Sequence, residues 1–391
     1  MLDIATREFV EQHRNDDVRV LALQAKRFPA VDMHEAVVQI EGWQAAKAKL
    51  PTWAATEGIL FPPKISMEQC SSELTAKYKA SLVGGSCFAD LTGGFGIDFS
   101  YISRGFDKAV YIERNEKLCA IARENFSLLG LEHATVLNGN SEEILALLDA
   151  MDWIFVDPAR RDGDGRKVVA LSDCEPNVVA LEELLLKKSG KVMVKCSPML
   201  DITEACRQLK NIEEIHIVAV NNECKELLFV LGSDAVGAPP VHCVNIVKEE
   251  VHDFVFTHDD EASASAAFCN EVGTYLYEPN AAVQKSGCSS VLSQRYGVKK
   301  LHPNSRLYTS EECVSSFPGR LFEVTEVFGF SKSEIKKVQA LQKANITVRN
   351  FPENVQQLRK RLKLSDGGDN YIFATTLADG SKVLLLCKKA G

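Results

Sequence analysis

The sequence lacks the features that mark membrane, secreted and metal-stabilised proteins. None of its apolar runs approaches the ~18–20 uninterrupted residues of a membrane helix. Residues 1–14 carry charge of both signs without the apolar core of a secretory signal, so we expect a cytoplasmic location. The 12 cysteines form no CxxC pair and, with the histidines, no zinc-finger spacing. We therefore expect reduced, mostly buried thiols and no bound metal.

Internal repeats and low-complexity segments are also missing, and the composition is that of a globular protein. Of the 391 residues, 46% are hydrophobic and 25% are charged, which excludes collagen-like and largely disordered chains. The net charge of −8 is uneven, because residues 316–391 hold 13 Lys and Arg against 7 Asp and Glu. A basic end is typical of a segment that binds a polyanion, although an unpartnered basic surface has the same composition.

Hydrophobic periodicity divides the chain into four segments. Residues 1–80 predict helices, and residues 81–232 alternate strands with helices, which is typical of a doubly wound parallel sheet. Residues 233–315 predict a small α+β module, and residues 316–391 a basic α/β module. A short Asn221-Asn222 connection predicts that the last strand of the sheet runs antiparallel. The seven strands of this sheet are predicted at 87–91, 109–113, 134–137, 153–157, 192–196, 214–220 and 226–231.

A glycine-rich loop follows the first predicted strand. The strand ends in Asp90, and Thr92, Gly93, Gly94 and Gly96 follow it. Glycines at this place let a ligand approach the backbone closely and present N–H groups at the start of a helix. A nicotinamide dehydrogenase would need a third glycine at position 99, where this chain has Phe.

The next three strands also end in polar residues. Glu113 ends the second strand, where an acidic side chain accepts hydrogen bonds from ribose hydroxyls. Asn140 follows the third strand, and Asp157 ends the fourth. Ligands bind at the carboxyl edge of open α/β sheets, so these residues predict a nucleotide cofactor there.

Taken together, these motifs resemble those of the class I S-adenosylmethionine-dependent methyltransferases. DLTGGFG looks like their first motif, and VDPARR occupies the place of their D/N-P-P-Y/F motif. PPKISMEQCSSE, VKCSPMLD and EPNAAVQKSG are similar to segments of bacterial methyltransferases that end in a THUMP-like domain. The resemblance implies a seven-stranded Rossmann-like sheet over residues 85–232, S-adenosylmethionine as cofactor, a ferredoxin-like piece before the last module, and RNA (tRNA or rRNA) as partner. It implies cofactor contacts from Asp90, Thr92, Gly93, Gly94, Gly96, Glu113, Asn140 and Asp157.

The same resemblance places Asp157 nearest the chemistry. In relatives that methylate exocyclic amines, this side chain and the carbonyl after it accept the hydrogens of the amine, which implies roles for Asp157 and Pro158. Ala159 and Arg160 stand where those enzymes carry a second Pro and an aromatic residue, and this departure leaves amine methylation open. Arg160 and Arg161 can clamp RNA phosphate or stack on a base, or else bond the acidic loop that follows them.

Cys196 allows a second chemistry. RNA pyrimidine C5-methyltransferases carry a nucleophilic cysteine at the matching place, and Lys195 beside Cys196 can lower the pKa of such a thiol. A buried strand cysteine explains the same residue. Lys195 and Ser197 complete the expected substrate contacts.

Two predicted helices of the last module carry basic residues on one face, which suits either a phosphate backbone or solvent. Three functions therefore remain open. The first is methylation of an RNA base, the second is methylation of a protein or small molecule, and the third is binding of cofactor or RNA without turnover. The basic residues are Lys332, Lys336, Lys337, Lys343, Arg359, Lys360, Arg361 and Lys363.

Overall fold

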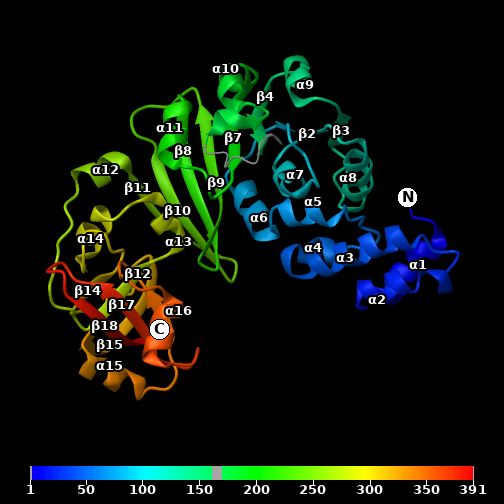
Figure 1. Cartoon of the computed structure of the whole chain (residues 1–391). Helices are drawn as coiled ribbons and strands as arrows, with labels where there is room; N and C mark the ends of the chain where they lie inside the picture. Colours follow the sequence, from blue (N-terminus) through cyan, green and yellow to red (C-terminus); the bar gives the residue numbers. More distant parts are fainter. Residues whose placement is uncertain (1, 161–169, 391) are drawn as a thin grey trace. The chain divides into compact units, whose positions relative to one another are not determined.

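The structure is a computed structural model that describes residues 2–160 and 170–390 (Figure 1). It contains two compact units. The first consists of residues 1–214 and 226–235, and the second of residues 215–225 and 236–391. Among the described residues, no helix is both long and apolar enough to cross a membrane.

Helices precede the sheet in the first unit. Residues 4–23 form two helices, because Asp17 accepts the N–H of Arg19 and starts the second one. Asp32 and Ser72 cap the following helices in the same way, as is usual for short polar side chains at helix starts. The helices are α1 (Ile4–His13), α2 (Val18–Leu23), α3 (Met33–Lys49), α4 (Pro51–Ala55), α5 (Lys64–Gln69) and α6 (Glu73–Ser81).

A mostly parallel sheet forms the centre of the first unit. Its strands run in the order β9-β7-β4-β1-β2-β3, and β9 is antiparallel to β7, with Lys191 opposite Gly232. The predicted antiparallel last strand is thereby confirmed. The strands are β1 (Cys87–Asp90), β2 (Lys108–Glu113), β3 (Ala134–Asn138), β4 (Met151–Val156), β7 (Ser189–Cys196) and β9 (Glu223–Gly232).

Helices connect these strands and pack on them. Helix α8 packs on β2 and β3, and α10 packs on β7 (Figure 1). A separate two-stranded ribbon follows β4, in which Ala159 pairs with Glu175. The helices are α7 (Ile97–Ile102), α8 (Glu116–Leu128), α9 (Ser141–Leu147), α10 (Val178–Lys188) and α11 (Ile202–Gln208), and the ribbon is β5 (Ala159–Arg160) with β6 (Cys174–Glu175).

The second unit begins with three strands and a short helix. Strand β8 (Ile212–Val220) pairs in parallel with β10 (Pro240–Val247), which forms a hairpin with β11 (Glu250–Thr257). Helix α12 (His258–Ser263) follows. All seven strands predicted for the methyltransferase sheet are present, and β10 and β11 come in addition.

A second sheet contains the C-terminal modules. Its strand order is β13-β14-β12-β15-β18-β17-β16. Helices α15 and α16 cover a core that includes Ile335, Val338, Leu358 and Leu362. The elements are β12 (Tyr275–Pro279), α13 (Ala281–Ser286), α14 (Ser290–Tyr296), β13 (Lys299–Lys300), β14 (Tyr308–Ser310), β15 (Gly319–Gly329), α15 (Lys332–Gln339), β16 (Asn345–Val348), α16 (Val355–Leu362), β17 (Tyr371–Thr376) and β18 (Lys382–Lys389).

The fold class predicted from the sequence is confirmed: a doubly wound α/β sheet with helices before it and small α/β modules after it. The four segment boundaries divide the chain differently from the two contact units, and they stay a prediction.

Candidate active site

The loop after β1 is shaped by glycines that leave no room for side chains. A Cβ atom on Gly93 would lie 2.1 Å from the Tyr111 ring, and one on Gly96 would lie 2.8 Å from the Phe126 ring. Gly94 and Gly96 also have φ angles of 56° and 87°, in the left-handed region that favours glycine. The N–H groups of all three glycines donate to protein oxygen atoms within 2.8–2.9 Å. These glycines therefore give the loop its shape, while the three N–H groups that we expected to face a ligand are already bonded.

A cavity of about 300 Å³ opens beside this loop at the carboxyl ends of the strands. Its size suits a small molecule better than a strand of nucleic acid. Lys195, from the end of β7, contributes to its wall. The predicted cofactor residues all line it, namely Asp90, Thr92, Gly93, Gly94, Gly96, Glu113, Asn140 and Asp157.

Two side chains in the wall are held by the backbone around them. Glu113 accepts the N–H of Asn115 at 2.7 Å through Oε1 and the N–H of Gly94 at 2.9 Å through Oε2. Asn140 caps α9, because its Oδ1 accepts the N–H of Glu142 at 2.8 Å, which leaves its amide NH₂ group as a donor. A carboxylate and an amide at these strand ends suit ribose hydroxyls and an adenine ring, so the residues fit the expected cofactor.

Thr92 ties the ends of β1 and β4 together. Its hydroxyl accepts the backbone N–H of Asp157 at 2.7 Å, and its own N–H donates to Asp90 at 2.9 Å. Burial raises the pKa of Asp90 well above its usual range; the N–H of Thr92 opposes this rise, and the negative charges of Asp98 and Asp157 add to it. The cavity thus has one carboxyl group that favours its neutral form beside another that is ion-paired.

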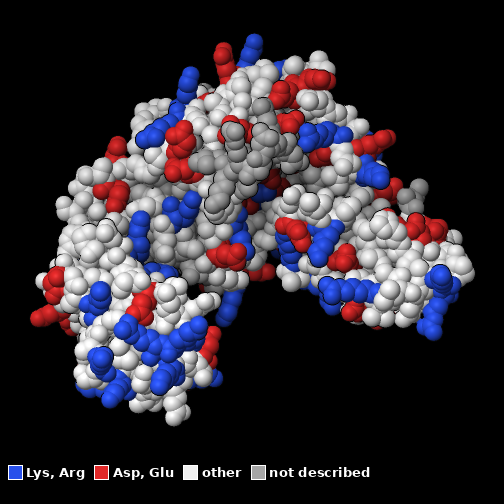
Figure 2. All heavy atoms as spheres, in the orientation of Figure 1, with Lys and Arg blue, Asp and Glu red and all other residues white. Residues whose placement is uncertain are grey.

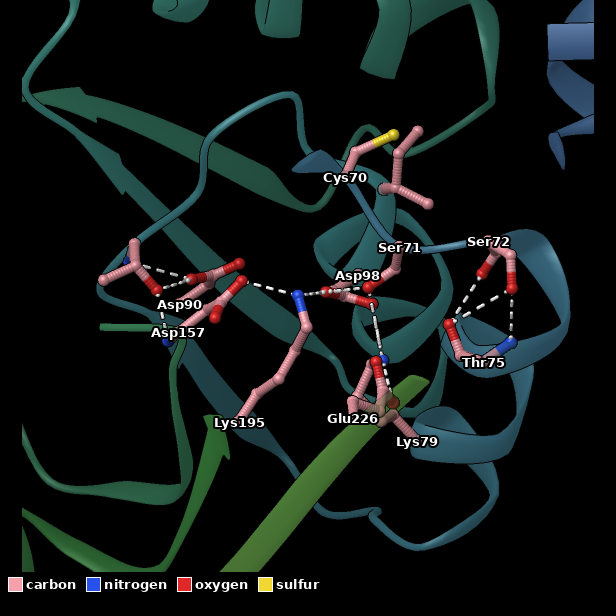
Figure 3. Close-up of polar contacts among 12 residues, drawn as sticks. Cys70, Ser71, Ser72, Thr75, Lys79, Asp90, Asp98, Asp157, Lys195 and Glu226 are labelled. Carbon is pink, nitrogen blue, oxygen red and sulfur yellow. Dashed lines mark hydrogen bonds and ion pairs between the residues drawn. The ribbon is translucent and has the colours of Figure 1, made fainter. Parts of the chain in front are cut away.

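That ion pair joins Asp157 to Lys195 (Figure 3). The Lys195 ammonium lies 2.5 Å from Asp157 Oδ2 and 3.4 Å from Asp98 Oδ2. Burial lowers the pKa of Lys195, but the charges of Asp157, Asp98 and Glu226 outweigh it and raise the pKa well above the usual range. The surrounding carboxylates therefore favour the charged form of Lys195.

Further buried charges continue from Asp98 away from the cavity. Asp98 accepts a hydrogen bond from Ser71 at 2.7 Å and pairs with Lys79 at 3.1 Å. Lys79 is fully buried and pairs with Glu226 at 2.5 Å. Burial raises the pKa of Asp98, yet the ammonium groups of Lys79 and Lys195 outweigh this effect and leave it below its ordinary value. Four elements, α6, α7, β7 and β9, thus share one buried charge network (Figure 3).

The structure does not support Cys196 as a nucleophile. The residue is 6% exposed and is not among the described residues that line the cavity. Burial and the charges of Asp157 and Cys174 raise the pKa of its thiol, and the ammonium of Lys195 opposes this rise without overcoming it. A neutral buried thiol is a poor nucleophile. We therefore interpret Cys196 as a core residue and do not propose methylation of a pyrimidine C5 atom.

Other predicted residues lie outside the cavity wall or outside the described part. Pro158 does not line the cavity, and exposed Ser197 accepts the N–H of Met199 in a local turn at 3.2 Å. The backbone of Arg160 pairs with Cys174 in the ribbon. Its side chain and the whole of Arg161 lie outside the described residues, so their predicted RNA contacts stay predictions.

Four residues that line the cavity were not predicted from the sequence. They are Ser66, Gln69, Cys70 and Ser71, from α5 and the link to α6. The segment PPKISMEQCSSE, which drew attention only by its resemblance, was the available signal. Its polar residues bring helix α5 and the link to α6 into the site.

The sheet and this site define the class of protein, an S-adenosylmethionine-dependent methyltransferase. Three family models match the chain: one described as conserved hypothetical protein 95 over residues 74–221, one as a ferredoxin-like domain over residues 275–318, and one as THUMP domain-like over residues 319–389. The chain belongs to the same family as a protein of Porphyromonas gingivalis W83 that is proposed to be a methyltransferase. The two are 37% identical over 100% of both chains, with a TM-score of 0.91.

Two other solved structures share only part of the fold. An rRNA methylase from Streptococcus thermophilus is 14% identical, and the match covers 41% of this chain and 93% of that one, with a TM-score of 0.31. The TrmK protein of M. capricolum, solved with S-adenosylhomocysteine, is 11% identical over 41% of this chain and 68% of that one, with a TM-score of 0.32. At these TM-scores they add nothing to the assignment. A search of the curated proteins finds no match.

Proposed function

We propose that this methyltransferase transfers a methyl group from S-adenosylmethionine to a nitrogen atom of a base in RNA. One observation carries the choice of RNA: the THUMP-like module bears a face of exposed lysines that have no acidic partner in the described part of the chain. The nitrogen acceptor follows from Asp157, which faces the cavity, and from Cys196, which does not.

Five lysines make up this face, which we call the free-lysine face. Figure 2 shows Lys and Arg gathered over the C-terminal module. Three basic residues of its helices are neutralised in ion pairs, Lys337 with Glu334, Arg359 with Asp366, and Arg361 with Glu353. Unpaired exposed cations are available to release counterions from a phosphate backbone. The lysines of the face, all exposed and with no ion pair found among the described residues, are Lys332, Lys336, Lys343, Lys360 and Lys363.

The cavity residues have distinct proposed tasks toward the cofactor. We assign Glu113 to the ribose hydroxyls and Asn140 to the adenine ring. Asp90 and the loop with Thr92 would bind the amino-acid end. The bound cofactor supplies a methyl group already activated by its positive sulfur, so the protein needs to align the acceptor and exclude water.

Asp157 orients the acceptor. Lys195 binds its Oδ2 atom, and the side chain remains 37% exposed, so Oδ1 is the oxygen available to a substrate. There it accepts a hydrogen bond from an acceptor N–H and directs the nitrogen lone pair toward the methyl group. Asp157→Asn replaces one acceptor oxygen with a donor, and we expect kcat to fall about 100-fold or more.

The test is transfer of labelled methyl from S-adenosylmethionine to RNA taken from cells that lack this protein. We expect label in one RNA pool, and an N-methylated base after nuclease digestion. The variant K332Q/K336Q/K360Q should lose transfer at low RNA concentration and regain it at high concentration. Label that appears only in protein or small molecules would overturn the choice of RNA, and a C5-methylated pyrimidine would overturn the choice of nitrogen.

A matched control variant distinguishes an effect of the free-lysine face from an effect of the net charge alone. Lys26, Lys108 and Lys187 are also exposed but lie in the first unit. The triple variant K26Q/K108Q/K187Q removes the same charge and should keep the wild-type KM for RNA. Equal losses in both variants would show a general charge effect. The cytoplasmic location expected from the sequence stays a prediction.

A further inference from the structure

The end of β7 holds a cation that neither cofactor binding nor RNA binding explains. Lys195 is only 9% exposed, yet it contributes to the wall of the cavity. Its two closest partners are both carboxylates, Asp157 at 2.5 Å and Asp98 at 3.4 Å. Burial of an ammonium is costly unless it is paired, so this arrangement needs a specific reason.

We propose that Lys195 is a positioning residue, which locks the Asp157 carboxylate in the orientation that methyl transfer needs. This proposal adds a positioning residue to the active site of the function proposed above. Only its activity test rests on that proposed function. Lys195 itself touches no reacting atom. It binds Oδ2 of Asp157 and thereby fixes where Oδ1 faces the cavity.

The physical basis is that the two side chains of the ion pair differ in their freedom to move. Asp157 follows the last residue of β4, and its side chain is 37% exposed, so by itself it can turn about its side-chain bonds. Lys195 is confined by the buried pocket and by Asp98. A short charge-assisted hydrogen bond from a confined donor restricts the acceptor, and it is stronger in a buried site than in water.

The network behind Lys195 keeps the donor in place. Asp98 is itself held in place, because Ser71 donates to its Oδ2 atom at 2.7 Å and Lys79 pairs with its Oδ1 atom at 3.1 Å. Lys79 is in turn anchored by Glu226 from β9. Lys79 belongs to helix α6. This helix therefore contributes, through Asp98 and Lys195, to the alignment of the Asp157 carboxylate (Figure 3).

The first experiment compares Lys195→Met with Lys191→Met. Lys191 lies on the same strand, and its ion pair with Glu213 is half exposed, so its variant is a matched control. Crystal structures of both variants should show Asp157 displaced only in Lys195→Met. An Asp157 carboxylate unmoved in Lys195→Met would overturn the proposal, whether or not the protein methylates RNA. Should Lys195→Met fail to fold, Lys195→Met/Asp98→Asn removes one charge of each sign and serves in its place.

The second experiment is a double-variant cycle in the methyl-transfer assay. We expect Lys195→Met to lower kcat about 100-fold while changing KM for S-adenosylmethionine less than threefold, and Lys195→Arg to restore part of kcat. Because Lys195 acts through Asp157, adding Lys195→Met to Asp157→Asn should cost less than a further threefold. If the falls in kcat of the two single variants multiplied in the double variant, the two residues would act independently and the proposal would be overturned. Absence of label from the wild-type protein would instead count against the proposed function, and the crystallographic comparison would still decide the role of Lys195.

Discussion

Lysines occupy two opposite environments in this protein. In the active-site network, Lys79 and Lys195 are buried and each contacts two carboxylates. On the free-lysine face of the THUMP-like module, the lysines are exposed and unpaired among the described residues. The first group is bound to its partners in the folded chain, whereas the second is left available for a partner outside it.

The environment of a lysine decides which property of the protein its loss would change. A buried ammonium removed from its partners leaves uncompensated charges in a medium of low dielectric, which is strongly destabilising. An exposed lysine contributes little to folding, and its loss is felt in the binding of anions. Stability and RNA affinity should therefore respond to different variants.

The largest expected effect on folding is that of Lys79→Met. Its ammonium lies 3.1 Å from Asp98 and 2.5 Å from Glu226, and the residue is fully buried. We expect a loss of about 3–5 kcal/mol in the free energy of unfolding, measured by urea titration, because buried Glu226 loses the ammonium that it contacts and Asp98 keeps only Lys195 as a cationic partner. The variant Lys79→Met/Glu226→Gln should recover part of the loss. A loss of less than about 1 kcal/mol for the single variant would show that the network is open to water.

The next effect concerns RNA affinity and its dependence on salt. We expect K332Q/K336Q/K360Q to lower RNA affinity about tenfold or more at 0.15 M salt and to reduce the slope of log K against log salt by about 2–3, as for three lost phosphate contacts. Fluorescence anisotropy from 0.05 to 0.3 M salt measures both. K26Q/K108Q/K187Q should keep the wild-type slope, and a slope unchanged in the first variant would place the RNA on another surface.

The sequence predicted the strand-end residues well, because parallel strands bring their carboxyl ends to one edge of the sheet. Asp90, Glu113, Asn140 and Asp157 meet at the cavity for this reason. The interpretation of the glycines was less accurate. Gly93 avoids the Tyr111 ring, a packing need that no loop pattern reveals.

The buried network could not have been predicted from local pattern. Lys77 and Lys79 lie on the same helix, yet Lys77 is half exposed and pairs with Glu73, while Lys79 is fully buried. The partner that distinguishes them, Glu226, lies 147 residues farther along the chain. Val355 and Leu358 likewise lie on one helix, yet Val355 is 37% exposed whereas Leu358 is fully buried. Burial of a charge depends on the tertiary contacts that surround it.

A smaller effect is expected from the pH dependence at Asp90. Burial raises the pKa of Asp90 in the folded chain, so the folded state holds its proton at a pH where the unfolded state has released it. The stability of the wild-type protein should therefore decline as pH rises from the unfolded value of about 4 through the raised folded value. Asp90→Asn removes this decline. Urea unfolding at pH 4.5 and 7.5 should show the variant gaining stability relative to wild type at the higher pH. An equal difference at both pH values would contradict the raised pKa.

The smallest expected effect on RNA affinity is a difference between two lysines of a single helix. Lys336 and Lys337 are adjacent and both exposed, but only Lys337 has an acidic partner, Glu334 at 2.8 Å. The Glu334 carboxylate raises the pKa of Lys337 and offsets its charge toward an approaching phosphate. We expect Lys337→Gln to change RNA affinity less than twofold, and Lys336→Gln to lower it about two- to threefold, with neither variant moving the melting temperature by more than about 1 °C. Anisotropy titrations at 0.1 M salt resolve such a difference. Equal losses from both would mean that the RNA displaces Glu334 from its lysine, and that pairing in the free protein does not decide which lysines bind.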